Sequence, residues 1–287
     1  MAQIKARENY VILLDLLAKA NDSVKEPSIS DVTERERLLD AHRLANKFIG
    51  HALTVLHLSR GYKVKELPSF QPVNFTDSWS IDVLTRTAME AFLTFHYVFY
   101  APATKVEKDC RYWAYKAAGI AERKNAPAST EEYRQKQVEE QKELDKLHKW
   151  LKSNTVFQSL TDKQKNRILG GEWRLKSWRE IAIDARFSNM LASHIYSHLS
   201  GYAHSSHMSV LQVSQALENK DMDMLVEPSI DIMSILNANM IWEYCELFPK
   251  AQDVLRGSGA SNFVEVWIDI GRRLDENLDT ATGRIND

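Results

Sequence analysis

The chain has 287 residues, of which 44% are hydrophobic and 26% are charged, so it can bury a core without cross-links. A formal net charge of −2 provides no general attraction for nucleic acid or anionic membranes, so any polyanion site must be local. Cys110 and Cys245 match no metal or redox spacing, which favours a reducing compartment. The first ten residues carry charges where a signal peptide is apolar, and no uncharged apolar run reaches about 18 residues. We therefore expect a cytoplasmic protein with no membrane partner.

The first third of the sequence shows helical periodicity and no strand-like alternation. Apolar residues recur at intervals of three and four between the prolines and glycines. Thr33 and Glu36 have the spacing of a capping box, and Asp77 can cap a later helix. The pattern predicts a first helix that contains residues 10–17, and further helices over 33–59 and 77–102.

Two further helices are predicted over 105–123 and 129–152, separated by Ala126-Pro-Ala-Ser129. Ser129 and Glu132 form a second capping-box pattern. The early half of the second helix lacks apolar residues at coiled-coil positions, so a coiled-coil arm is the weaker interpretation. We expect a solvated antiparallel hairpin that protrudes over residues 103–153.

The last part of the chain also shows signals for helix starts and helix ends. Gly170 and Gly171 end a short amphipathic piece, and Ser177-Trp-Arg-Glu180 is a capping pattern for the next helix. Pro228 and Pro249 are predicted to bracket a long apolar helix, and a final helix is expected over 262–278. The sum is about ten helices, which predicts an all-α multi-helix bundle or array forming a single domain over 1–287.

The segment 187–217 contains no Asp, Glu, Lys or Arg, although it holds four of the nine histidines and several serines. If it is helical to about residue 203, Tyr196 and Ser200 lie in a hydroxyl stripe that His204 extends. A surface with small polar side chains and no charge suits packing against something else. Two interpretations stay open: a buried structural helix, or a functional cleft.

A second group of polar residues lies inside the predicted helix 77–102. Arg86 and Glu90 are one turn apart and can pair, but their apolar neighbours leave only a narrow polar face. A partly buried ion pair needs additional hydrogen-bond partners, which the uncharged segment could supply. The pair is therefore either structural or part of a site.

These motifs occur in a recognisable order: Arg86-Thr-x-x-Glu90, then Trp173 or Trp178 ahead of a capped helix, then Tyr196-x-x-x-Ser200-x-x-x-His204. In this order they resemble a bacterial family of helical domains of unknown function, over roughly residues 35–215. The resemblance implies a single site, catalytic if the protein is an enzyme, made of Arg86, Glu90, Tyr196, Ser200 and His204.

The chain also resembles, more distantly, the higher eukaryotes and prokaryotes nucleotide-binding (HEPN) domains. Many of these are RNA-cleaving toxins or defence factors with an Arg and a His four to six residues apart near a dimer interface. Arg37 and His42 have this spacing, but leucine follows Arg37 where those nucleases carry a polar residue. Arg86 with His204 is the better pair, because His can transfer a proton while Arg holds a phosphate.

Metal binding is the competing chemistry for the histidines. His194 and His198 are one turn apart and could share an ion with His204, His207 or Glu90, but no His-Glu-x-x-His pattern is present. The sequence also contains no glycine-rich phosphate loop, nucleophile elbow or deaminase signature, so we expect no metal and no nucleotide cofactor.

Two functional hypotheses follow. The first is a HEPN-like, metal-independent ribonuclease or RNA-binding module in bacterial stress or phage defence, with RNA as its partner. The second is a non-enzymatic interaction protein in which segment 187–217 forms the interface of a homodimer or of another complex. Whether the protein is an enzyme is left open by the sequence.

Overall fold

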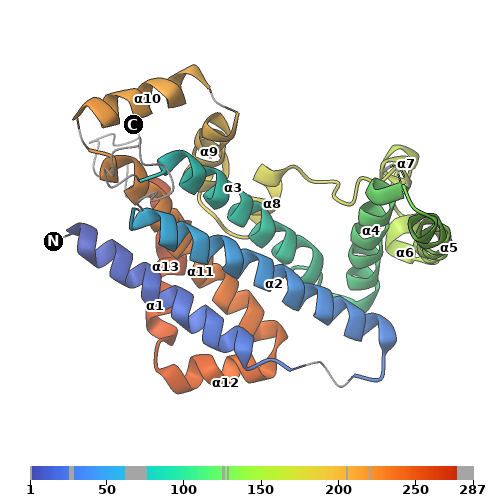
Figure 1. Cartoon of the computed structure of the whole chain (residues 1–287). Helices are drawn as coiled ribbons and strands as arrows, with labels where there is room; N and C mark the ends of the chain where they lie inside the picture. The colour runs from blue at the N-terminus through green and yellow to red at the C-terminus, as the bar shows by residue number, and fades with distance from the viewer. Residues whose placement is uncertain are drawn as a thin grey trace, which may run out of the picture. The chain divides into compact units, whose positions relative to one another are not determined.

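The computed structural model describes residues 2–25, 29–61, 76–124, 127, 129–204, 206–219 and 221–276, without the side chains of residues 2–5 and 124. Throughout this part of the chain the secondary structure is helical and no strand is present, which confirms the all-α class (Figure 1). No helix in it is long and apolar enough to cross a bilayer. The described residues form thirteen α-helices and two π-helical segments, η1 and η2, against the ten or so helices expected.

The chain divides into two compact units. Unit 1 comprises Met1–Ser28, Leu38–Leu93 and Trp178–Asp287, and unit 2 comprises Ile29–Arg37 and Thr94–Ser177. The boundaries between the units fall within helices α2 (Val32–Ser59) and α3 (Ser78–Phe95).

Unit 1 is built around the apolar helix α11 (Asp223–Leu247), which is buried along most of its length. It packs against α1 (Ala2–Asp22), α12 (Pro249–Ser258) and α13 (Ser261–Arg272). Figure 1 shows α1 lying along α11. The remaining elements of unit 1 are α8 (Trp178–Asp184), η2 (Met190–Ile195), α9 (Tyr196–Ala203) and α10 (His207–Asn219).

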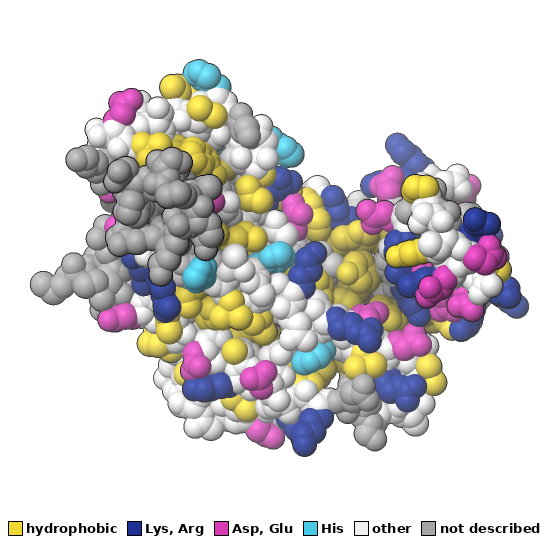
Figure 2. Space-filling model, viewed as in Figure 1, with side chains coloured by type: hydrophobic (Ala, Val, Ile, Leu, Met, Phe, Trp, Pro, Cys, Tyr) yellow, Lys and Arg dark blue, Asp and Glu magenta, His cyan; other side chains and the backbone are white. Residues whose placement is uncertain are grey.

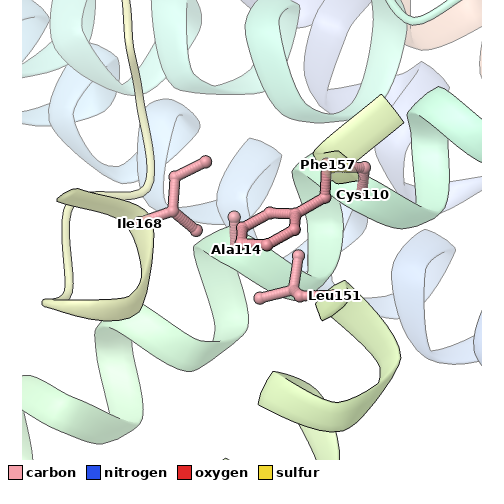
Figure 3. Packing of buried hydrophobic residues seen from close by; sticks show 5 residues of the cluster. All are labelled: Cys110, Ala114, Leu151, Phe157 and Ile168. Carbon is pink, nitrogen blue, oxygen red and sulfur yellow. The ribbon is translucent and has the colours of Figure 1, made fainter. Parts of the chain in front are cut away.

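Unit 2 contains η1 (His96–Tyr100), α4 (Lys105–Lys124), α5 (Glu131–Ser153), α6 (Thr155–Gln158) and α7 (Asp162–Leu169). Helices α4 and α5 pack against each other across the residues Ala117, Ile120, Leu144 and Leu147. A second cluster joins α4 to α6 and α7, and Figure 3 shows the Phe157 ring of this cluster directed toward Ala114, with Leu151 beside it.

Three predicted helix starts were wrong in detail. The cap of α2 is Asp31, whose Oδ1 accepts the Glu34 amide at 3.1 Å, so the capping box at Thr33 is not formed. The cap of α5 is Thr130 and not Ser129. Helix α11 begins at Asp223, so Pro228 lies inside it. Proline is tolerated there because it removes only the bond to the Met224 carbonyl, and Met224 is exposed to water.

The end of α8 shows a strained residue. The amide of Phe187 donates to the Ala182 carbonyl and that of Arg186 to the Ile183 carbonyl, which is the Schellman arrangement of a helix end. Arg186 therefore adopts a φ of 63°, in the left-handed region where glycine is favoured.

Arg186→Gly should raise the free energy of unfolding by about 1 kcal/mol, because glycine has no Cβ to clash in the left-handed region. Urea unfolding followed by circular dichroism measures this change. Arg186→Ala is the control, since it keeps the Cβ and should give no such gain. A loss of stability in the glycine variant would mean that contacts of the Arg186 side chain outweigh the backbone strain.

Candidate functional site

The candidate site lies in unit 1, between one face of α3 and one face of α9. Arg86 and Glu90 are four residues apart on α3, and Tyr196, Ser200 and His204 are four residues apart along α9 and its C-cap. Side chains at this interval share a helix face. Helix α9 continues through Gly201, as the hydroxyl stripe requires.

Glu90 and Tyr196 hold the Arg86 guanidinium from one side. Arg86 Nη2 lies 3.2 Å from Glu90 Oε1 and 3.4 Å from the Tyr196 hydroxyl. The Tyr196 hydroxyl in turn donates to Glu90 Oε1 at 2.9 Å. The Arg86 and Glu90 side chains are 22% and 30% exposed, so this ion pair lies at the edge of the core and not within it.

His204 contacts the other side of the guanidinium. Arg86 Nη1 lies 3.4 Å from His204 Nε2. A guanidinium nitrogen can only donate, so Nε2 is the accepting nitrogen and the neutral ring carries its proton on Nδ1. His204 itself is exposed. The basic nitrogen of an exposed imidazole is thus held beside a fixed positive charge.

The charges of the cluster are fixed by its internal contacts. The hydrogen bond with Tyr196, assisted by Glu90, raises the pKa of Arg86, which therefore stays protonated. Burial raises the pKa of Tyr196, and the neighbouring Glu90 carboxylate acts in the same direction, so the phenol keeps its proton. Arg86 Nε is buried without a hydrogen-bond partner among the described residues. Part of the donor capacity of Arg86 is therefore unused.

Ser200 is the one predicted site residue outside this network. It lies on the same face of α9 as Tyr196 and His204, but its hydroxyl makes no hydrogen bond within the described part of the chain. The structure therefore brings together Arg86, Glu90, Tyr196 and His204, and leaves Ser200 beside them.

Two side chains, Asp275 and Arg179, hold the segment that leads into α9. Asp275 accepts the amides of Asn189 and Met190 at 2.8 and 2.7 Å and so caps the start of η2. Arg179 on α8 donates to Asn189 Oδ1 at 2.8 Å and to the Ser193 hydroxyl at 2.6 Å. The π-helical segment η2 leads directly into Tyr196. Such segments are frequent at functional sites because they redirect side chains.

Asp82 is a neighbour of the site that sequence reasoning missed. It lies one turn before Arg86 on α3, is 3% exposed, and accepts a hydrogen bond of 2.5 Å from the Ser229 hydroxyl of α11. Burial raises its pKa to about 7. The charge of Asp82 also raises the pKa of Tyr202 on α9, after the larger effect of burial. The four-residue spacing to Arg86 is visible in the sequence, whereas the burial of Asp82 is not.

The alternative pair Arg37 and His42 serves other contacts. Arg37 is 1% exposed, and its Nε lies 3.1 Å from Glu34 Oε2. His42 Nδ1 is 2.7 Å from the Tyr244 hydroxyl. Five residues along α2 turn about 140° around the helix axis, so the two side chains point in different directions. Both make structural contacts.

The other histidines and the two cysteines considered as metal ligands or reactive groups make no such site among the described residues. His194 and His198 line a cavity of about 450 Å³ together with Asp231. In the described part of the chain, no group of three or more His, Cys, Asp or Glu side chains is arranged to hold a metal ion. Cys110 and Cys245 are buried, and burial raises the pKa of the Cys110 thiol to about 11 and that of Cys245 to about 12. Neither is therefore a thiolate at neutral pH.

Comparison with protein families gives a match over the site. The family described as a family of unknown function (DUF5677) matches residues 74–222, which is just over half of the chain and includes Arg86, Glu90, Tyr196 and His204. No curated protein and no solved structure gives a significant match.

Proposed function

The chain belongs to this family of unknown function, and we propose from the chemistry of the site that it is a ribonuclease that needs no metal ion. The observation that carries the proposal is that Arg86 contacts His204 Nε2 while His204 stays exposed. A fixed cation beside an accessible basic nitrogen suits a phosphodiester, whose charge the cation stabilises while the base removes a proton. The distant HEPN resemblance supports the same reaction, and a role in stress or defence follows from that resemblance alone.

In the proposed reaction, the bound phosphate replaces His204 Nε2 as the acceptor of the Arg86 Nη1 hydrogen bond, and the freed Nε2 takes the proton of a ribose 2′-hydroxyl. The 2′-oxygen then bonds to the adjacent phosphorus. The bond from phosphorus to the 5′-oxygen breaks, and the leaving oxygen takes a proton from water at the exposed side of the site. Arg86 stabilises the charge that develops on the phosphoryl oxygens. Tyr196 and Glu90 position the guanidinium through the contacts described above. The products are a 2′,3′-cyclic phosphate and a 5′-hydroxyl.

The test is cleavage of a mixed RNA pool by the purified protein, with and without EDTA. We expect cleavage that EDTA does not abolish, because the nucleophile comes from the RNA and the protein supplies only proton transfer and charge. RNA with 2′-O-methyl ribose should resist cleavage. If the wild-type protein cleaves no RNA with or without divalent metal, the ribonuclease proposal falls.

A second candidate function rests on a different observation. Four apolar residues of the uncharged segment are exposed on α10: Met208, Val210, Leu211 and Leu217. Exposed apolar side chains with no charged residue between them favour association, and two copies of this uncharged part of α10 do not repel each other. We propose a second copy of this chain as the partner.

Leu211→Lys should convert a dimer into a monomer, since it places a charge on each of the two facing surfaces. Analytical ultracentrifugation at a series of protein concentrations measures the change. Asp253→Lys, on the exposed side of α12, is the control and should leave the dimer intact. A wild-type protein that is monomeric at tens of micromolar, a range in which stable dimers persist, would remove this candidate.

A further inference from the structure

A second cavity lies wholly within unit 2. It has a volume of about 550 Å³ and runs along α4 beside the glycine turn that follows α7. The residues that give it its character are Tyr115, Lys116, Gly119, Glu122, Gly171 and Trp173.

Its aromatic wall is held rigidly. The ring centroids of Tyr115 and Trp173 are 5.4 Å apart and the rings are nearly perpendicular, at 82°. A second ring, Tyr97, lies 5.9 Å from Trp173 on centroids, and the Arg111 guanidinium covers Tyr97 at 4.3 Å. Trp173 is nevertheless partly exposed. A partly exposed indole fixed by two other rings can stack on a planar ligand with little loss of side-chain entropy.

The part of the cavity wall formed by α4 includes Gly119, which contributes no side chain. Gly119 lies in the middle of α4, where glycine costs about 1 kcal/mol relative to alanine. A Cβ at Gly119 would meet no atom within 4 Å, so no neighbour requires glycine there. Its effect is to leave the surface of α4 without a side chain beside Tyr115 and Trp173.

Unit 2 has a positive net charge, although the net charge of the whole chain is slightly negative. Its residues include 19 Lys and Arg against 14 Asp and Glu, a formal charge of +5 in a chain whose total is −2. Figure 2 shows dark blue and magenta side chains interspersed over α4 and α5. At the rim of the cavity, Lys116 Nζ is held 2.9 Å from Glu36 and 3.1 Å from Glu143. Glu122 makes no ion pair within the described part of the chain.

From these features we infer that the cavity of unit 2 binds one unstacked base of an RNA strand. The base lies over Gly119 with its face toward Trp173, and the excess of Lys and Arg in unit 2 attracts the phosphates. Glu122 accepts a hydrogen bond from an exocyclic amino group, as carboxylates do from cytosine, so bases with an amino group bind better than uracil. The inference rests on the proposed function in that RNA is the ligand.

The test uses fluorescently labelled 2′-O-methyl pentanucleotides, which keep the bases and phosphates of RNA but have no free 2′-hydroxyl to react. Anisotropy should show that the adenine pentamer binds about tenfold or more tightly than the uracil pentamer, within the range of one base contact. Gly119→Leu adds a side chain to this part of the wall and should weaken adenine binding at least about tenfold, since stacking of the base is lost. Gly50→Leu on α2 is the matched control, because a Cβ there also meets nothing within 4 Å.

Glu122→Gln is the second variant, and it should reduce the preference for adenine over uracil without disturbing the fold. Binding by Gly119→Leu that equals the wild type would overturn the inference, as would an unchanged preference in Glu122→Gln. If the protein cleaves RNA but these variants bind normally, the base site fails and the ribonuclease proposal stands. If the protein binds as expected but cleaves nothing, the base site stands alone.

Discussion

Replacing His204 by alanine should lower the rate of RNA cleavage at least about a hundredfold, because a positioned general base typically contributes that much or more. The loss arises from the missing Nε2 atom, which lies 3.4 Å from Arg86 Nη1 and is the only basic nitrogen placed beside the guanidinium among the described residues. Initial rates on a labelled RNA with a single cleavage site measure the effect.

Stability and binding distinguish a chemical role of His204 from a structural one. His204 is exposed and ends α9, so its replacement should leave the free energy of unfolding and the affinity for uncleavable RNA almost unchanged. His207→Ala is the matched control, since His207 is also an exposed histidine and begins the next helix, α10. Equal loss of cleavage in both variants, or full activity of His204→Ala, would exclude His204 as the base.

The wild-type protein should lose stability as the pH rises from about 4 to about 7, and Asp82→Asn should lack this loss. Burial raises the pKa of Asp82 from 3.8 to about 7, so the folded state favours the protonated form. That contribution is complete below the unfolded pKa and disappears as the pH passes the folded pKa. Each pH unit in this window is worth about 1.4 kcal/mol for one group, so the total reaches a few kcal/mol.

Urea unfolding at pH 5 and pH 8 measures the difference between the two proteins. Asp82→Asn should be the more stable at pH 8, because asparagine keeps an acceptor for Ser229 and never ionises. Asp253→Asn on the exposed side of α12 is the control and should keep the wild-type slope. If the wild type and Asp82→Asn change stability in parallel with pH, Asp82 ionises as freely in the folded protein as in the unfolded one.

Many of the helices were predictable because their apolar residues recur at helical spacing, as α13 shows with Val264, Trp267 and Ile268 buried. Their exact starts were less predictable. Neighbouring residues such as Ser129 and Thr130 have equal capping chemistry, and only the backbone angles decide which one caps. The short helix α6 was missed because four residues cannot show a period.

The candidate site shows the same limit. The four-residue intervals in Arg86–Glu90 and Tyr196–His204 identify two helix faces, but not that these faces meet; the order of the motifs supplied that link. Ser200 fits the interval as well as its neighbours do, yet its hydroxyl makes no hydrogen bond among the described residues. A shared helix face does not ensure that a short side chain reaches the partner helix. Asp82 was overlooked since a carboxylate usually lies in water, and its partner Ser229 is 147 residues away.

The π-helical segment η2 makes the orientation of α9 depend on the length of the chain before it. A π-turn contains about one residue more than an α-turn, and one residue corresponds to about 100° of rotation around a helix. A relative of this protein with one residue fewer between Ser188 and Tyr196 could keep every helix and still turn His204 away from Arg86. Among homologous proteins, a single-residue gap in this stretch would therefore mark the loss of the site even where Arg86 and His204 are both kept.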